Sequence, residues 1–170
     1  MHLVIGGARS GKSRLAERIA AEYPPVVYVA TAEPRDEEMT DRIGRHRERR
    51  PADWRTIEVP RDLAAAIASH GTTAGTMLIE CVTLWVSNVL LESPRPSATE
   101  ILQQVNAAID AARRATADFV WVTNEVGSGI VPENALAREF RDVLGEANER
   151  LAAAADHVLL CVAGIALKLK

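Results

Sequence analysis

Residues 6–13 read Gly6-Gly7-Ala8-Arg9-Ser10-Gly11-Lys12-Ser13, the phosphate-binding pattern of a glycine, four residues and then Gly-Lys-Ser. The glycines let successive backbone N–H groups point into one concavity that holds an anion. Lys12 can reach the β- and γ-phosphates of a nucleoside triphosphate, and the Ser13 hydroxyl can ligate Mg²⁺. We therefore assign residues 6–13 to nucleotide binding.

The segments on both sides of this loop fit a strand–loop–helix unit. Residues 3–5 form a short apolar run that enters the loop, and residues 13–20 have the pattern of a helix that leaves it. Such a helix directs the positive end of its dipole at the phosphates. The alternative is a glycine-rich turn that binds no ligand.

Apolar, β-branched runs recur along the chain with helical patterns between them. Most of the runs lack the alternation of a half-exposed strand, so both of their faces should be buried. This order predicts an α/β fold with a mostly parallel sheet flanked by helices. The expected strands are 3–5, 26–30, 56–59 (a less apolar edge strand), 77–81, 119–123 and 158–162, and the expected helices lie around 12–22, 36–50, 61–70, 82–91, 97–116 and 133–155.

The composition is that of one globular domain spanning residues 1–170. Hydrophobic residues make up 48% of the chain and charged residues 25%, which is ordinary for a soluble protein. The net charge of −3 gives no support for a nucleic-acid partner, and no apolar stretch is long enough to span a membrane. Cys81 and Cys161 lack CxxC spacing and are expected in the core of a cytoplasmic protein.

A second candidate site is the group of arginines around one histidine in residues 42–50. Helical spacing puts Arg42, His46 and Arg50 on one face. Nearby cations disfavour the protonated imidazole, so His46 is expected to stay neutral and to be available as a nucleophile. From these residues alone, a solvated basic helix face with an incidental histidine is the alternative. A nucleic-acid patch is disfavoured because no aromatic residues accompany the charges.

A third element is the apolar run 77–79, which ends in the carboxylate of Glu80. In phosphate-loop enzymes such a strand commonly lies beside the loop and presents its acid to Mg²⁺. Aspartate is more usual there, so a strand-end glutamate that faces water is the alternative. His2, His70 and His157 lie at the ends of expected elements and are interpreted as structural or surface residues.

Taken together, these segments resemble the bifunctional adenosylcobinamide kinase/adenosylcobinamide-phosphate guanylyltransferase family of cobalamin synthesis. The resemblance extends over essentially the whole chain. The phosphate loop is shared with many NTPases, whereas the His46 segment and the Asn-Glu-Val-Gly-Ser-Gly-Ile-Val-Pro stretch are specific. The segments that carry it are residues 6–13, 45–46, 50–58, 80–85, 124–132 and 148–151.

The resemblance implies two reactions on one RecA-like phosphate-loop domain that forms a homotrimer. Adenosylcobinamide is first phosphorylated with ATP or GTP, and GMP then passes from GTP through a guanylyl-histidine at His46, giving adenosylcobinamide-GDP and pyrophosphate. Lys12 is implied to be catalytic, and Ser13 and Glu80 to hold Mg²⁺. Nucleotide contacts are implied for Ala30, Thr31, Ala32, Arg47, Glu48, Arg49, Arg50, Glu58 and Glu80.

Two of these positions have a chemical reading of their own. Thr31 follows the second strand at the edge where α/β sheets bind ligands. Glu58 could accept hydrogen bonds from the N1–H and N2–H₂ groups of guanine, which adenine lacks.

Arg45 stands where some relatives place a second histidine, so only one histidine can react here. The rival hypotheses are a monofunctional small-molecule kinase and a nucleotide-gated binding protein.

Overall fold

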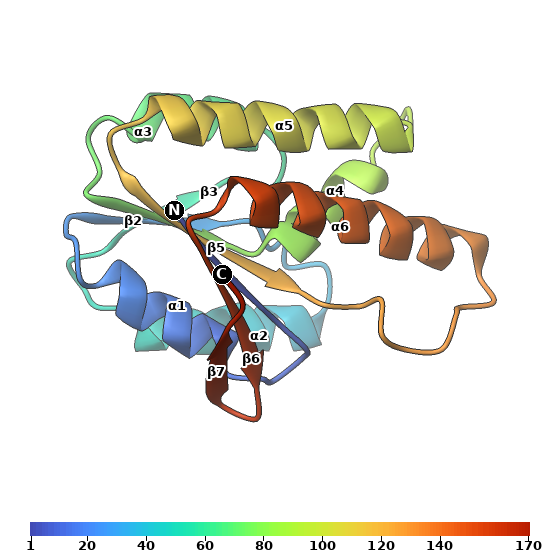
Figure 1. Cartoon of the computed structure of the whole chain (residues 1–170), viewed down its shortest axis with the longest axis horizontal. Helices are drawn as coiled ribbons and strands as arrows, with labels where there is room; N and C mark the ends of the chain where they lie inside the picture. Colours follow the sequence, from blue (N-terminus) through green and yellow to red (C-terminus); the bar gives the residue numbers. More distant parts are fainter.

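A seven-stranded sheet forms the centre of the computed structural model, which describes all 170 residues (Figure 1). The strand order is β3-β2-β4-β5-β1-β6-β7. All pairs are parallel except β6 and β7, which are antiparallel. The strands are β1 (His2–Gly6), β2 (Val26–Ala30), β3 (Arg55–Glu58), β4 (Thr76–Glu80), β5 (Asp118–Asn124), β6 (His157–Val162) and β7 (Ile165–Lys168).

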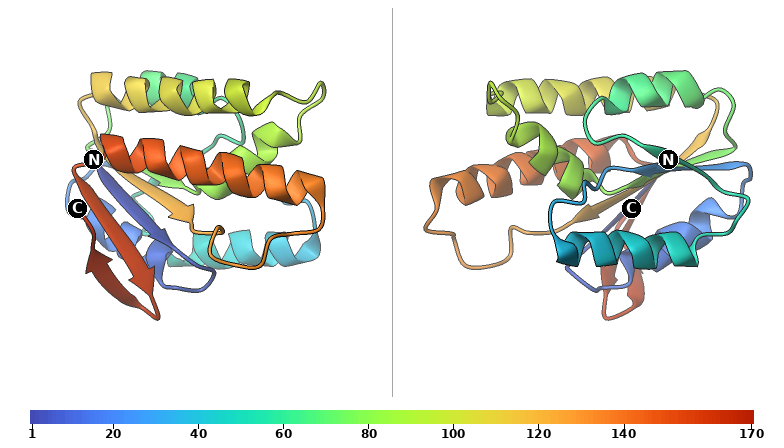
Figure 2. Two further views of the ribbon diagram at one scale, coloured as in Figure 1. Left: turned by 45° about the vertical axis from the view of Figure 1, so that its right-hand side comes forward. Right: turned by 180° about the vertical axis from the view of Figure 1, so that it is seen from behind.

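Six helices cover the two faces of this sheet. Helices α1 and α2 lie on one face, and the other four lie on the opposite face (Figures 1 and 2). The helices are α1 (Lys12–Ala20), α2 (Glu37–Arg49), α3 (Leu63–His70), α4 (Val82–Leu90), α5 (Ala98–Arg114) and α6 (Ala135–Ala154). None of them combines the length and the hydropathy needed to cross a membrane.

Local sequence explains where several helices begin. Asp36 caps α2 by accepting a 2.7 Å hydrogen bond from the backbone N–H of Met39. Ser97 caps α5 in a reciprocal capping box with Glu100, and the Asn134 side chain caps α6. Each cap satisfies a backbone donor that the first helical turn leaves unpaired.

The core is split by the sheet into two apolar layers. Strand residues alternate between the layers, so that Leu3 belongs to the larger cluster of 29 buried residues and Val4 to the smaller cluster of 10. The larger layer lies under α3–α6, and the smaller one packs against Ala16 and Ala20 of α1. Both cysteines are buried free thiols, as predicted.

All the expected strands and helices are present, and β3 lies at the sheet edge as predicted. The strand β7 was not predicted. Its four residues, Ile-Ala-Leu-Lys, are all exposed, and this run is shorter and less rich in β-branched residues than the runs of the buried strands. Its connection to β6 is a two-residue turn through Ala163 (φ 51°) and Gly164 (φ 82°), and alanine is an uncommon residue in such a turn.

Parallel pairing brings the carboxyl ends of β1, β2, β4 and β5 to the same end of the sheet. The chain termini lie at the opposite end, where the strands begin and the N-terminal ammonium contacts Asp156 at 2.7 Å. His2 and His157 also meet there, with ring centroids 4.8 Å apart. The phosphate loop, Thr31 and Glu80 therefore lie together at the carboxyl ends of the strands.

Candidate active site

The phosphate loop joins β1 to α1 and is packed against the β6–β7 hairpin. A side chain at Gly6 is excluded because its Cβ would lie 2.4 Å from the Cys161 carbonyl oxygen. Gly11 caps α1 in the left-handed region at φ 94°. The Lys12 side chain is buried, and its ammonium donates to the Gly7 carbonyl at 3.1 Å. Burial lowers the pKa of Lys12. The loop backbone therefore holds the Lys12 ammonium in a fixed position at the phosphate loop.

A cavity of about 480 Å³, here called the phosphate cavity, opens above this loop. Its lining carries six lysine and arginine side chains against one carboxylate, so it suits a polyanion. Helix α2 supplies the far wall. The lining residues are Ala8, Arg9, Ser10, Gly11, Lys12, Ser13 and Arg14 with Glu38, Arg42, Arg45, His46 and Arg49.

Glu80, the last residue of β4, meets Ser13 at the end of the phosphate loop. The Ser13 hydroxyl donates to Glu80 Oε1 at 2.8 Å, while Glu80 Oε2 is buried without a partner. Burial raises the pKa of Glu80 to about 7, although the Ser13 hydrogen bond and Lys12 oppose that shift. Mg²⁺ is commonly held by one or two protein oxygens together with substrate phosphates. A hydroxyl and an unpartnered carboxylate oxygen fit that donor set. Nowhere in the structure do three or more His, Cys, Asp or Glu side chains form a group that could hold a metal ion.

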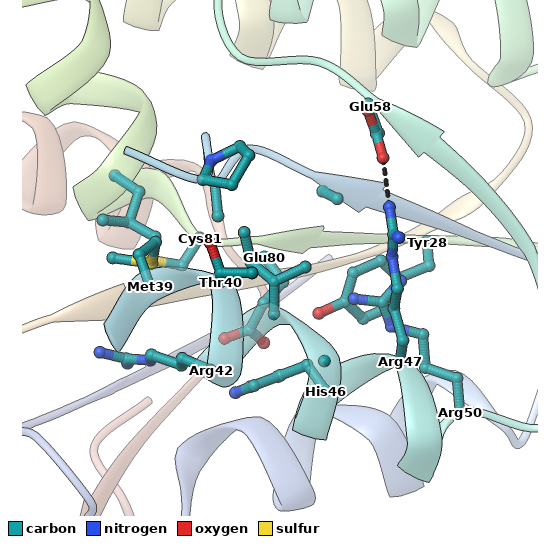
Figure 3. Close-up of a pocket in the computed structure, with 16 residues that line it drawn as sticks. Tyr28, Met39, Thr40, Arg42, His46, Arg47, Arg50, Glu58, Glu80 and Cys81 are labelled. Carbon is teal, nitrogen blue, oxygen red and sulfur yellow. Dashed lines mark hydrogen bonds and ion pairs between the residues drawn. The ribbon is translucent and has the colours of Figure 1, made fainter. Parts of the chain in front are cut away.

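A second cavity of about 350 Å³, here called the apolar cavity, is drawn in Figure 3. It adjoins the first, because Arg42 and His46 line both. Its floor is Tyr28, and the guanidinium of Arg50 lies 3.5 Å from the centroid of that ring. Apolar walls come from β2, α2 and α4. The lining residues are Tyr28, Ala30, Ala32, Pro34, Met39, Thr40, Arg42, Ile43, Gly44, His46, Arg47, Arg50, Glu58, Glu80, Cys81 and Leu84.

His46 lies at the boundary, because it lines both cavities. It projects from α2 to the same side as Arg42 (Figure 3). The neighbouring charges were predicted to keep the ring neutral, and the pKa of His46 is indeed lowered to about 4. Burial is the largest cause, however, and the cations of Arg49, Arg42 and Arg50 come after it.

The neighbour of the ring also assigns its tautomer. Arg49 Nη2 lies 3.3 Å from His46 Nδ1. A guanidinium only donates, so Nδ1 is the acceptor and the neutral ring carries its proton on Nε2. The lone pair of the imidazole therefore lies on Nδ1, beside an arginine that can also contact phosphate oxygens.

Helix α2 is held in place mainly by charged side chains, because none of its residues is fully buried. Arg47 pairs with Glu58 of β3 at 2.5 Å (Figure 3), and Arg49 pairs with Glu17 of α1 at 3.1 Å. Arg50 was predicted to share the helical face of His46. It lies just past the helix in extended conformation instead, where it stacks on Tyr28.

Four of the expected nucleotide contacts line neither cavity, namely Gly6, Gly7, Thr31 and Glu48. The Thr31 side chain is fully buried, donates to the Cys81 carbonyl at 2.8 Å and accepts from the Cys81 N–H at 2.7 Å. It therefore ties the ends of β2 and β4 together. Glu48 is exposed and lines neither cavity. Gly6 and Gly7 are the first two residues of the phosphate loop, and the remaining expected residues line one cavity or both.

The comparison with known proteins agrees with this geometry. Residues 2–169 match the family described as cobinamide kinase/cobinamide phosphate guanyltransferase. The chain belongs to this family. It is 46% identical over its whole length to the bifunctional adenosylcobalamin biosynthesis protein CobU of Salmonella typhimurium, and covers 99% of that protein.

Two further relatives also match this chain over almost its whole length. CobU of Escherichia coli K12 is 45% identical over the whole chain and 99% of its own length. The bifunctional adenosylcobalamin biosynthesis protein CobP of Pseudomonas aeruginosa is 41% identical over 99% of this chain and 96% of its own length. The family to which the sequence motifs pointed is therefore confirmed.

Arg42 was expected only as a cation beside His46, and the structure adds that it lines both cavities. Two further residues that contact the site were not assigned a role from sequence. Tyr28 and Glu17 gave no signal, because one lies within an apolar strand and the other on an ordinary helix. Their contacts with Arg50 and Arg49 exist only in the folded chain.

Proposed function

We propose that the chain phosphorylates adenosylcobinamide with a nucleoside triphosphate, and then transfers GMP from GTP to the product through His46. The observation that carries this proposal is the place of His46 at the boundary between a cationic cavity and an apolar one. In GTP the α-phosphate joins the nucleoside to the β- and γ-phosphates. A nucleotide that fills both cavities therefore presents its α-phosphorus to this histidine.

The guanylyl transfer follows from the state of the ring. When Arg49 donates to a phosphate oxygen in place of His46, the Nδ1 lone pair is free to form a bond to the α-phosphorus. The bond to the α,β-bridging oxygen breaks, and pyrophosphate leaves with the electron pair. The Nε2 proton is released to solvent, and Arg49 and Lys12 face the negative charge. A phosphate oxygen of cobinamide phosphate then attacks the α-phosphorus, and the imidazole leaves and regains its proton.

The kinase step uses the same phosphate cavity with attack at the γ-phosphorus. Lys12, fixed by the Gly7 carbonyl, reaches the terminal phosphates. Mg²⁺, held by Ser13 and Glu80, would neutralise charge on these phosphates. Phosphoryl transfer needs little covalent help from the protein beyond positioning and charge neutralisation.

Selection of guanine is assigned to Glu58. Its carboxylate lines the apolar cavity, and one of its oxygens is paired with Arg47. The other oxygen can accept from guanine N1–H or N2–H₂, a donor pair that adenine lacks. Arg47 directly follows the nucleophile, so base recognition and His46 share one short stretch of α2.

A trimeric, cytoplasmic enzyme completes the proposal. The C-terminal hairpin exposes Val162, Ile165, Leu167 and Leu169, each more than half accessible, and such clustered apolar side chains favour contact with another copy. Two free buried cysteines fit a reducing compartment. Light scattering of the purified protein tests the trimer directly, and a monomer at micromolar concentration would contradict it.

Mass spectrometry of the intact protein after incubation with GTP tests the covalent step. The wild type should gain one GMP, an acid-labile adduct that peptide mapping places on His46. His46→Ala should gain none, while His70→Ala, a histidine on α3 outside both cavities, should be labelled like the wild type. A wild type that phosphorylates cobinamide but is never guanylylated would be a monofunctional kinase instead.

A further inference from the structure

Asn124 ends β5, the strand that lies between β1 with the phosphate loop and β4 with Glu80. It pairs in register with Gly6, whereas Glu80 pairs with Val122. Asn124 therefore extends two residues beyond Glu80, on the order of 6.6 Å along the strand. The next N–H along the chain donates to the Gly6 carbonyl at 3.3 Å. This position is beside Gly6, the first residue of the phosphate loop, at the carboxyl ends of the parallel strands.

Buried polar side chains fix the backbone of Asn124 on both sides. Its N–H donates to Thr83 Oγ1 at 2.7 Å, and its carbonyl accepts from Asn148 Nδ2 at 3.0 Å. Asn148 is itself held by the Thr123 hydroxyl at 2.7 Å. Thr83, Thr123 and Asn148 are all buried. Three buried polar residues from α4, β5 and α6 thus converge on one strand end.

The side-chain amide, in contrast, makes no hydrogen bond within the protein. Asn124 Oδ1 is buried without a partner, and a buried acceptor left unpaired is destabilising. Three of the other four unpartnered buried atoms are Ser10 Oγ, Arg50 Nε and Glu80 Oε2, and these residues line the two nucleotide cavities. Three of the five unsatisfied buried atoms therefore belong to residues that line the cavities, and Asn124 Oδ1 is a further unsatisfied atom at the end of the strand beside the phosphate loop.

We propose that Asn124 is a catalytic residue of the kinase step, an inference that rests on the proposed function. Its Oδ1 accepts the attacking hydroxyl of the cobinamide substrate, and its Nδ2 donates to a γ-phosphoryl oxygen. The hydroxyl oxygen forms a bond to the γ-phosphorus, and the bond to the β,γ-bridging oxygen breaks. The nucleoside diphosphate leaves with the electron pair, and the hydroxyl proton passes to an oxygen of the transferred phosphoryl group.

This role is confined to one of the two reactions. Asn124 lines neither cavity, whereas His46 and the α-phosphate position lie at the boundary between them. An amide beside the first loop residue is suited to the γ-phosphate and to a hydroxyl that approaches over the end of β5. The hydroxyl of cobinamide therefore reacts at the γ-phosphorus beside Asn124. The phosphate of cobinamide phosphate reacts at the α-phosphorus that His46 carries.

The test separates the two steps with Asn124→Ala. The kcat for phosphorylation of cobinamide should fall roughly 100-fold, as when one charge-stabilising donor is removed, with the KM for the nucleotide nearly unchanged. Guanylyl transfer, measured on supplied cobinamide phosphate, should keep the wild-type rate. The Tm should not fall, because the amide holds nothing in the protein. Asn106→Ala, an exposed asparagine on α5, is the matched control and should retain both activities.

Several outcomes would overturn the inference. Undiminished phosphorylation by Asn124→Ala would remove the residue from the reaction, and equal loss of both steps or a lower Tm would make its role structural. Full activity of Asn124→Asp would also contradict it, because a carboxylate lacks the amide donor and repels phosphate. A wild type that forms the GMP adduct but never phosphorylates cobinamide would refute the kinase half of the proposed function, and this inference with it.

Discussion

The phosphate loop and helix α2 face the same cavity but are positioned by different forces. The loop is locked by backbone packing, since Gly6 abuts the Cys161 carbonyl and the Ser10 carbonyl accepts from the Gly164 N–H at 2.8 Å. Helix α2 has no fully buried residue, and ion pairs with Glu17 and Glu58 tie it to the rest of the molecule.

This difference matches what each region binds. The loop must hold the same phosphates in both reactions, so a rigid cradle serves both. The helix carries His46, which is needed in one reaction only, and exposed ion pairs contribute only about 0–1 kcal/mol each. The nucleophile is therefore placed by weak, separable contacts, whereas the anion site is part of the sheet.

The largest effect is expected from the helix, in His46→Ala. Guanylyl transfer should fall to background, because no other histidine lines the cavities and the covalent carrier is lost. Phosphorylation of cobinamide should continue. Separate assays with cobinamide and with cobinamide phosphate measure the two rates. Full guanylyl transfer by this variant would exclude His46 as the nucleophile and remove the contrast between the regions.

The matching change in the loop, Lys12→Ala, should damage both reactions. One buried ammonium serves the phosphates in each chemistry, and loss of such a group costs roughly 10²–10³ in rate. The same two assays apply, together with nucleotide affinity. Kinase activity that survives with normal affinity would mean a second nucleotide site.

The third prediction concerns the partner of α2 on the sheet edge. Glu58→Gln should weaken GTP binding more than ATP binding, because the amide sets a donor against the guanine donors. A mismatch costs about 1–3 kcal/mol. The side chain is 67% exposed in the free protein, so we expect the lower end, about tenfold in affinity. Titration of both nucleotides decides the matter, with Glu22→Gln, an exposed glutamate that lines neither cavity, as control. Equal losses for GTP and ATP would remove Glu58 from base recognition.

The loop was predictable from sequence in a way that the helix contacts were not. The spacing of Gly6, Gly11 and Lys12 encodes a local backbone shape, and buried parallel strands appear in the sequence as apolar runs. Periodicity likewise indicates that α2 is a helix. Which of its arginines face a cavity depends on how α2 rests on the sheet, and the Arg49–Glu17 pair joins residues 32 positions apart. Such contacts arise from tertiary packing and leave no sequence pattern.

The fourth prediction tests the electrostatic setting of the helix. The pKa of His46 lies at about 4 in the folded protein against an ordinary value of 6.5. As the pH falls, the unfolded chain therefore binds this proton before the folded protein does. Because of this residue, the free energy of unfolding decreases progressively between pH 6.5 and about 4. NMR titration of the ring in the nucleotide-free protein should give a midpoint near 4, so that the nucleophile is neutral at pH 5–8. A midpoint near 6.5 would mean that α2 leaves His46 in solvent.

The smallest effect is expected from Gly44→Ala within α2. No atom lies within 4 Å of the added Cβ, in contrast to Gly6, so the methyl group meets no obstacle. Alanine is about 1 kcal/mol more favourable than glycine inside a helix. A weakly attached helix opens locally before the protein unfolds, so the gain should appear as roughly fivefold slower amide hydrogen exchange across Glu37–Arg49 rather than in the slowest amides of the sheet. If exchange in α2 instead matched that of the sheet core in the wild type, the helix would open only with global unfolding. The distinction between a locked loop and a separately attached helix would then be wrong.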